Sequence, residues 1–223
     1  MKKSIILFTL LLGSLICSAQ NKETITVAGG QQLSDVVYLH EEFIKGNVLF
    51  KSGNRAAPLM NYNMLSKLVQ FKDESGKIMD IDNPDDIATL SLGGKSYVYN
   101  SNGYSQYIGL YGDIALTKQD YLLLRDILAE AGYGGQSGTT SASSMSAMEQ
   151  SVDYRLPVGE SRVYEKTAAY YLVKNGKSMA LNQKNLAKCF PKQKAFIAEY
   201  FATNDVNLDD EAQVKALLDK LSE

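Results

Sequence analysis

The sequence predicts an α+β protein: a β-rich antiparallel meander, sandwich or roll with a C-terminal tail of short amphipathic helices. Short alternating segments recur at roughly 8–12-residue spacing between turn residues through the first half of the chain, as in antiparallel folds. The hydrophobic period then changes to that of helices near the C-terminus. Strands and helices do not alternate along the chain, which argues against a parallel sheet.

The first 19 residues have the features of a secretory signal peptide. Two lysines precede an apolar run from Ile5 to Ile16, which is shorter than the roughly 20 residues of a membrane-spanning helix. Small residues at Cys17 and Ala19 fit a signal-peptidase site, so we expect residues 1–19 to be removed after Ala19. The predicted product is periplasmic, outer-membrane-associated or extracellular, with no transmembrane span left after signal removal.

The alternative to cleavage after Ala19 is a lipid anchor on Cys17. Lipoprotein signals place a small residue before the modified cysteine, whereas Ile16 is bulky, so the sequence disfavours this anchor. Cleavage after Ala19 leaves Cys189 as a lone cysteine, which cannot form an internal disulfide. We expect Cys189 to be a small buried hydrophobe.

Residues 20–131 form the predicted β-rich part. Gly93–Gly94 between two alternating runs is the strongest hairpin signal. Residues 119–131 fit a helix or a buried strand, and periodicity does not decide between them. The expected strands are Thr24–Val27, Phe43–Lys51, Leu59–Leu65, Leu68–Lys72, Ile78–Ile81, Ile87–Leu92 and Lys95–Tyr99.

Residues 132–150 are rich in Gly, Ser, Thr and Ala, which predicts a flexible loop. Residues 151–181 then form a predicted β-hairpin part, with strands at Val163–Val173 and Ser178–Leu181 around a turn at Asn175–Gly176. Whether the parts on either side of the loop share one core stays open at this point.

Residues 182–223 form the predicted helical tail. Asn182 is suited to cap a first helix, and Pro191 suits the first turn of a second. A last helix begins at Asn207 or Asp209. Because short amphipathic helices cannot cover each other, we expect them to pack on the sheet. The expected apolar faces are Phe196, Ile197, Tyr200 and Phe201, and then Val214, Leu217, Leu218 and Leu221.

Several short motifs are spread along the chain. They are Ala19–Gln20; Asn61–Tyr62–Asn63; a motif around a turn, with Gln70, Phe71 and Gly76; Tyr170–Tyr171–Leu172; Asn175–Gly176–Lys177; and the helix start at Lys184 to Lys192. With this layout the chain resembles a family of uncharacterised exported proteins of Bacteroidota, periplasmic or outer-membrane-associated. The resemblance implies an envelope location and a shared fold. It implies no activity and no site residues.

Composition limits the possible chemistry. The chain has 223 residues, a formal net charge of -2, one His and two Cys. The near-balanced charge gives no basis for nucleic-acid binding, and so few ligating and nucleophilic residues lead us to expect no cofactor and no catalytic centre. His40 with Glu41 and Glu42 is the only place where an imidazole adjoins carboxylates, and we interpret it as a solvated strand edge.

Two clusters are candidate sites. Five tyrosines between polar residues suit a ligand-binding surface, because a tyrosine ring is rigid and amphipathic, although ordinary strand positions explain them too. Four aspartates around Pro84 are weak metal candidates, because oxygen-rich turns can hold Ca²⁺, although no EF-hand pattern is present and Asp also favours turns. The residues are Tyr97, Tyr99, Tyr104, Tyr107 and Tyr111, and Asp80, Asp82, Asp85 and Asp86.

These observations favour a non-catalytic exported envelope protein that acts through contacts with a partner protein of unknown identity. The alternative is a glycan- or small-ligand-binding module that uses the tyrosine-rich surface. A hydrolase with a carboxylate pair from distant strands is a third hypothesis, because sequence does not place distant carboxylates relative to each other.

Overall fold

The computed structural model describes residues 23–100, 102–131, 135–138 and 155–222. It confirms a β-rich antiparallel protein with helices at the C-terminal end. Short 3-10 helices lie at Leu33–Asp35 and Pro84–Asp86. No helix in these ranges is long and apolar enough to cross a membrane.

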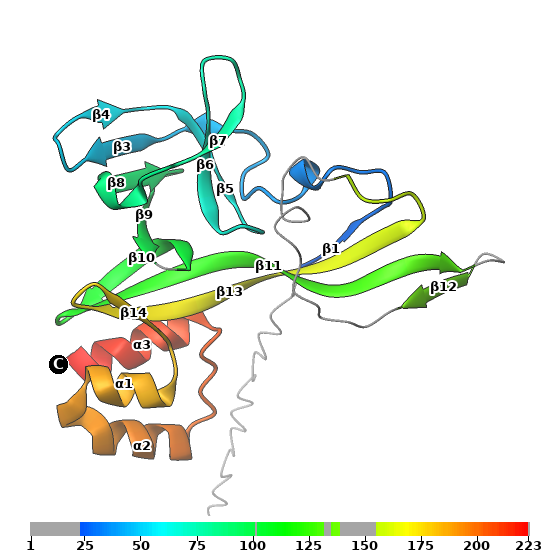
Figure 1. The fold of residues 1–223 in the computed structure, drawn as a ribbon. Coiled ribbons are helices and arrows are strands. Elements are labelled where there is room, and N and C mark those ends of the chain that lie inside the picture. The colour runs from blue at the N-terminus through cyan, green and yellow to red at the C-terminus, as the bar shows by residue number, and fades with distance from the viewer. Residues whose placement is uncertain (1–22, 101, 132–134, 139–154, 223) are drawn as a thin grey trace, which may run out of the picture.

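The larger sheet joins strands from both ends of the chain. Its strands are β1 (Thr24–Val27), β3 (Asn47–Phe50), β4 (Arg55–Ala56), β8 (Ile87–Leu92), β9 (Lys95–Asn100), β10 (Gly103–Tyr111), β11 (Ile114–Ala131), β12 (Gly135–Gly138), β13 (Glu160–Lys174) and β14 (Lys177–Ala180). The order is β1-β13-β11-β10-β9-β8-β3-β4, with β12 paired to β11 and β14 to β13. Figure 1 shows β11 and β13 running together through the middle of the molecule.

The smaller sheet holds β2 (Ile44–Lys45), β5 (Leu59–Asn63), β6 (Leu68–Lys72) and β7 (Ile78–Asp80), in the order β2-β5-β6-β7. The single strand expected at 43–51 is wrong, since the chain leaves this sheet at Gly46 and enters the larger one as β3. A Cβ at Gly46 would collide with the Met60 side chain and lie 2.8 Å from the Ser91 carbonyl oxygen. Glycine therefore permits the close approach where the chain changes sheets.

The two predicted tight turns are confirmed. Gly93 and Gly94 connect β8 to β9 with φ of 59° and 75°. Asn175 and Gly176 connect β13 to β14 with φ of 50° and 74°. These positive φ values are those that a two-residue hairpin turn requires, and Gly and Asn adopt them most easily.

Residues 119–131 are strand, as part of β11. This strand pairs with β13 from Ala115 opposite Val173 to Ala129 opposite Glu160. The parts on either side of the predicted 132–150 loop therefore share one sheet. Within that predicted loop Gly135–Gly138 forms β12, and the rest lies outside the described residues.

The helical tail consists of α1 (Gln183–Cys189), a 3-10 turn at Pro191–Gln193, α2 (Lys194–Thr203) and α3 (Glu211–Ser222). The predicted cap is confirmed: Asn182 Oδ1 accepts a hydrogen bond of 2.9 Å from the Asn185 N–H. Pro191 opens the 3-10 turn and not α2 itself. Figure 1 shows the three α-helices together at one end of the β11–β13 pair.

The predicted stripe of the last helix is confirmed, and that of α2 is confirmed in part. All four α3 positions are buried. In α2, Ile197 is buried and Tyr200 and Phe201 are partly buried against the same hydrophobic cluster, whereas Phe196 is 36% exposed. The reason is that α2 packs on α1 at the rim of the tail, whereas α3 lies against the sheet.

Two hydrophobic cores result, and we call them the N-terminal core and the C-terminal core. The N-terminal core includes Val48, Met60, Tyr62, Val69, Leu90, Tyr97, Tyr104, Leu122 and Tyr164. The C-terminal core includes Ile114, Leu116, Leu172, Leu186, Cys189, Ile197, Val214, Leu217, Leu218 and Leu221. Helices α1 and α3 therefore pack on the sheet, as predicted.

One face of β11 serves both cores. Its even-numbered side chains begin with Ile114 and Leu116 in the C-terminal core and continue to Leu122 in the N-terminal core. Lys118 and Asp120 lie between these two groups. Alternation keeps all five side chains on one face, and the twist of a long strand turns that face from one core to the other.

Candidate functional site

The five tyrosines singled out by the sequence do not form one exposed surface. Tyr97, Tyr104 and Tyr111 are 5%, 2% and 9% exposed and belong to the hydrophobic cores. Tyr99 and Tyr107 are 40% and 39% exposed. Tyr99 pairs with Tyr104 across the ladder, and Tyr107 alternates with Tyr104 along β10, so the two exposed rings lie on opposite faces of the sheet.

Burial also sets the protonation of the inward rings. Burial raises the pKa of Tyr97 to about 12, with a further contribution from the charge of Asp120. Burial likewise raises the pKa of Tyr104. Both phenols are therefore neutral at physiological pH, and within the described residues their hydroxyl groups have no hydrogen-bond partner. They act as core side chains.

Three large apolar side chains are exposed on the face of β9 and β10 that lies opposite Tyr99 and Tyr104. Val98 is 39% exposed and Leu110 is 64% exposed, and Tyr107 lies between them. Val98 pairs with Ser105, which shares the face of Tyr107 by alternation. Tyr107 pairs with Thr117 and Leu110 pairs with Ala115, and these two β11 residues share a face by alternation. Because the register shifts at a bulge between Tyr107 and Gly109, Leu110 lies on the same face as Tyr107.

The same face continues across β11 and β13. Thr117 lies between Tyr107 on one side and Tyr171 on the other, as direct partners in the ladder. Tyr121 follows on β11, with the Lys67 ammonium 5.1 Å from its ring centroid. We call this surface the outer face and define it by Val98, Tyr107, Leu110, Tyr121 and Tyr171.

Buried polar groups lie beneath the outer face. Thr117 is 0% exposed and Gln119 is 1% exposed. Gln119 Nε2 donates to the backbone carbonyls of Asn102 and Tyr104 at 3.1 and 3.2 Å. Within the described residues the Thr117 hydroxyl and Gln119 Oε1 have no partner. The outer face therefore has an aromatic surface above a polar layer.

The four aspartates singled out by the sequence lie near a cavity between the two sheets. Asp80, Asp82 and Asp86 belong to the lining of this cavity, whereas Asp85 does not. Gln70 Nε2 donates to Asp80 Oδ1 at 2.7 Å. Within the described ranges no group of three or more His, Cys, Asp or Glu side chains is arranged to hold a metal ion.

The cavity has a volume of about 360 Å³. Its walls come from both sheets and are apolar except at a polar rim of Asp80, Asp82, Asn83 and Asp86, which we call the acidic rim. Val48 and Met60 are its most buried wall residues, at 5% and 0% exposure. The other apolar lining residues are Phe50, Ala56, Pro58, Phe71, Ile81 and Ile87.

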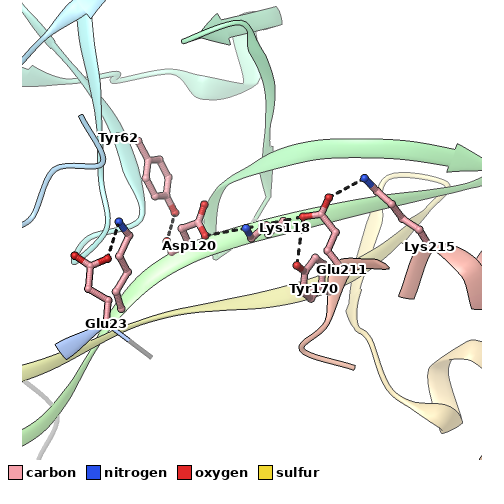
Figure 2. A network of polar contacts seen from close by, with 8 residues as sticks. Glu23, Tyr62, Lys118, Asp120, Tyr170, Glu211 and Lys215 are labelled. Atoms are coloured by element: carbon pink, nitrogen blue, oxygen red, sulfur yellow. Dashed lines mark hydrogen bonds and ion pairs between the residues drawn. The ribbon is translucent and has the colours of Figure 1, made fainter. Parts of the chain in front are cut away.

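A polar network connects the two cores (Figure 2). The Tyr62 hydroxyl donates to the Asp120 backbone carbonyl at 2.8 Å. Lys118 Nζ lies 3.4 Å from Asp120 Oδ1 and 3.9 Å from Glu211 Oε2. The Tyr170 hydroxyl donates to Glu211 Oε2 at 3.4 Å. This network joins the middle of β11 to the first turn of α3.

The hydrolase hypothesis needs two carboxylates from distant elements, and here Asp120 and Glu211 contact the same lysine. A hydrogen bond from Lys215, 2.7 Å from Glu211 Oε1, is the main cause of a lowered Glu211 pKa. A general acid needs a raised pKa. Glu211 therefore suits an electrostatic contact between sheet and helix better than proton donation.

The single histidine and the cysteine are placed as structural residues. Burial, followed by the charge of Lys95, lowers the pKa of His40. His40 packs beside Gly93, where an added Cβ would lie 3.0 Å from the ring. Cys189 is 3% exposed, which confirms the predicted buried hydrophobe, and burial raises the pKa of its thiol.

No family model, no curated protein and no solved structure matches this chain. The outer face and the cavity are therefore interpreted from their own geometry. Sequence reasoning missed the outer face, although the odd-numbered positions of β10 and β11 carried part of its signal. It also missed the cavity, because the cavity walls come from two sheets whose packing no local pattern reports.

Proposed function

We propose that this protein is a non-catalytic exported protein of the cell envelope that acts through protein–protein contacts, and that the outer face is its contact surface. The observation that carries this proposal is the gathering of exposed Val98, Tyr107 and Leu110 on one sheet face. Large contiguous apolar patches on a protein surface mark interaction sites, whereas scattered single apolar residues do not.

The chemistry of the outer face supports a protein partner. Tyrosine contributes a large apolar ring and a polar hydroxyl, and tyrosines are enriched in protein interfaces. Tyr107, Tyr121 and Tyr171 therefore suit a partner surface that offers apolar side chains and backbone polar groups. The expected location in the envelope follows from the features of residues 1–19.

The test is cross-linking of envelope fractions followed by mass spectrometry. We expect a partner to cross-link to the wild-type chain and to be depleted several-fold by the double substitution Tyr107→Ser and Leu110→Ser. The matched control is Tyr99→Ser with Leu59→Ser, because these side chains are 40% and 48% exposed but lie outside the outer face. The control should retain the partner.

Equal loss in both double variants, or recovery of the wild-type chain with no partner enriched, would contradict the outer face as the contact surface. Thermal unfolding of both variants shows whether each is folded.

The mass spectra from the cross-linking experiment also identify the N-terminal residue of the protein. A chain beginning at Gln20 supports export, an acylated Cys17 supports the lipid anchor, and retained Met1 contradicts export.

A further inference from the structure

Independently of the outer face, we propose that the cavity between the two sheets is a binding site for a small amphiphilic cation, a hydrocarbon or aromatic body that carries an ammonium group. The cavity of about 360 Å³ lies within the usual range of ligand pockets, roughly 300–1,000 Å³. Its apolar walls favour a hydrocarbon or aromatic body, and its acidic rim favours a positively charged group on the ligand.

The walls would bury a hydrocarbon on several sides. Val48 from β3 and Met60 from β5 are buried members of the N-terminal core. Phe50, Phe71 and Ile87 are partly buried and pack against that core. An apolar group entering this space would leave water for contact with core side chains, which favours binding.

The rim adds negative charge that no ion pair within the described residues neutralises. Asp82 and Asp86 are exposed lining residues, and within the described ranges no Lys or Arg forms an ion pair with either one. The Asp80 carboxylate accepts from Gln70, which fixes it at the β7 end of the cavity. An ammonium group at the mouth would therefore meet carboxylates, whereas an anionic ligand would be repelled.

Hydrogen bonds of Gln70 fix the position of the Asp80 carboxylate at the rim. Gln70 Oε1 accepts hydrogen bonds from Asn63 Nδ2 at 3.2 Å and from the Tyr38 hydroxyl at 2.8 Å, while its Nε2 holds Asp80. The rim carboxylate is thus connected to the buried amides of the smaller sheet. A preorganised polar group of this kind favours ligand orientation without a large ordering cost.

The test compares hexylammonium, hexanol and hexanoate as isosteric probes, with binding followed by chemical-shift changes of the Met60 methyl group. We expect hexylammonium to bind about fivefold more tightly than hexanol at low salt, from exposed charge pairs. Hexanoate should bind most weakly. The preference for the cation should shrink as salt is added, because exposed charges are screened.

Substitutions separate the two parts of the site. Asp82→Asn with Asp86→Asn should reduce the preference for hexylammonium over hexanol, because only the Asp80 carboxylate remains at the rim, while hexanol binding is kept. The matched control, Asp85→Asn, changes an acidic residue of the same turn that does not line the cavity, and it should leave all three affinities unchanged. Ala56→Trp, at an exposed lining position, should block all three probes.

Equal affinity of the wild-type protein for hexylammonium and hexanol would overturn the proposal, as would no shift of the Met60 methyl with any probe. A cross-link from Ala56 or Ile81 positions to a partner polypeptide, in the absence of probe binding, would also overturn it and assign the cavity to the protein interface. Failure of the outer-face variants to lose a partner does not affect these outcomes.

Discussion

The N-terminal core and the C-terminal core differ in how they satisfy their polar groups. The N-terminal core adjoins Asn61, Asn63 and Gln70, which are 0%, 1% and 8% exposed. Every side chain that α3 buries in the C-terminal core is aliphatic. A helix satisfies its own backbone internally, whereas the short strands and loops of the smaller sheet need side-chain amides to do so.

Asn61 illustrates this difference. Its Oδ1 accepts from the His40 and Tyr62 N–H groups at 3.1 and 2.9 Å, and its Nδ2 donates to the carbonyls of His40 and Glu42 at 2.7 and 3.1 Å. One side chain therefore holds the 40–42 loop against β5. The N-terminal core therefore depends on specific side-chain hydrogen bonds, whereas α3 contributes only aliphatic side chains to the C-terminal core.

The largest expected effect is that of Asn61→Ala. Loss of four hydrogen bonds in a buried position should lower the free energy of unfolding by about 4 kcal/mol, at about 1 kcal/mol each. Urea unfolding measures this change. The matched control is Asn54→Ala, at an exposed turn position, which should change stability little. A small effect for Asn61→Ala would show that the loop is held by other contacts.

Leu217→Ala tests the C-terminal core. Leu217 is 1% exposed, so the substitution leaves a cavity and should destabilise the protein by about 3 kcal/mol. Leu59→Ala, at a leucine that is 48% exposed, is the control and should cost far less. Because β11 serves both cores, we expect Leu217→Ala and Asn61→Ala to shift one cooperative transition. Two separate transitions would show that the cores unfold independently.

Much of the strand and turn pattern could be predicted from sequence, because it depends on local chemistry. The Gly93–Gly94 and Asn175–Gly176 turns require positive φ, and the sequence places suitable residues there. The predicted cap at Asn182 has the same local basis. The state of residues 119–131 could not be predicted, because pairing with β13, distant in sequence, decides it.

The candidate sites were less predictable. The tyrosine cluster was visible in the sequence, but which rings face outward depends on strand register and on what each face packs against. Asn61, Tyr62 and Asn63 stood out only through a resemblance, and the structure gives them a role in holding loops and joining the cores. The cavity depends on two sheets meeting, which no single segment reports.

A smaller effect is expected from Glu211→Gln, which tests the network joining the cores. The folded protein holds the pKa of Glu211 below its ordinary value of 4.5, mainly through the hydrogen bond from Lys215. The stability from this charge is therefore present above pH 4.5 and is lost as the pH falls through the folded-state pKa. The Glu211 side chain is 35% exposed, so we expect less than about 1 kcal/mol.

Melting temperatures of the wild type and Glu211→Gln between pH 7 and pH 3 measure this contribution. The wild type should be the more stable above pH 4.5, and the two curves should converge at lower pH, where Glu211 is protonated and resembles Gln. A constant difference at every pH would show that the carboxylate charge plays no part in joining β11 to α3.

The smallest expected effect, and the only stabilising one, is that of Thr117→Val under the outer face. The Thr117 hydroxyl is fully buried between Tyr107 and Tyr171 and has no partner within the described residues. Valine keeps the β-branched shape and removes a desolvated polar group, so the protein should gain about 0.5 kcal/mol. Thr117→Ser keeps the hydroxyl and removes the methyl group, and it should lose stability. Destabilisation by Thr117→Val, measured by urea unfolding, would show that the hydroxyl is bonded in solution.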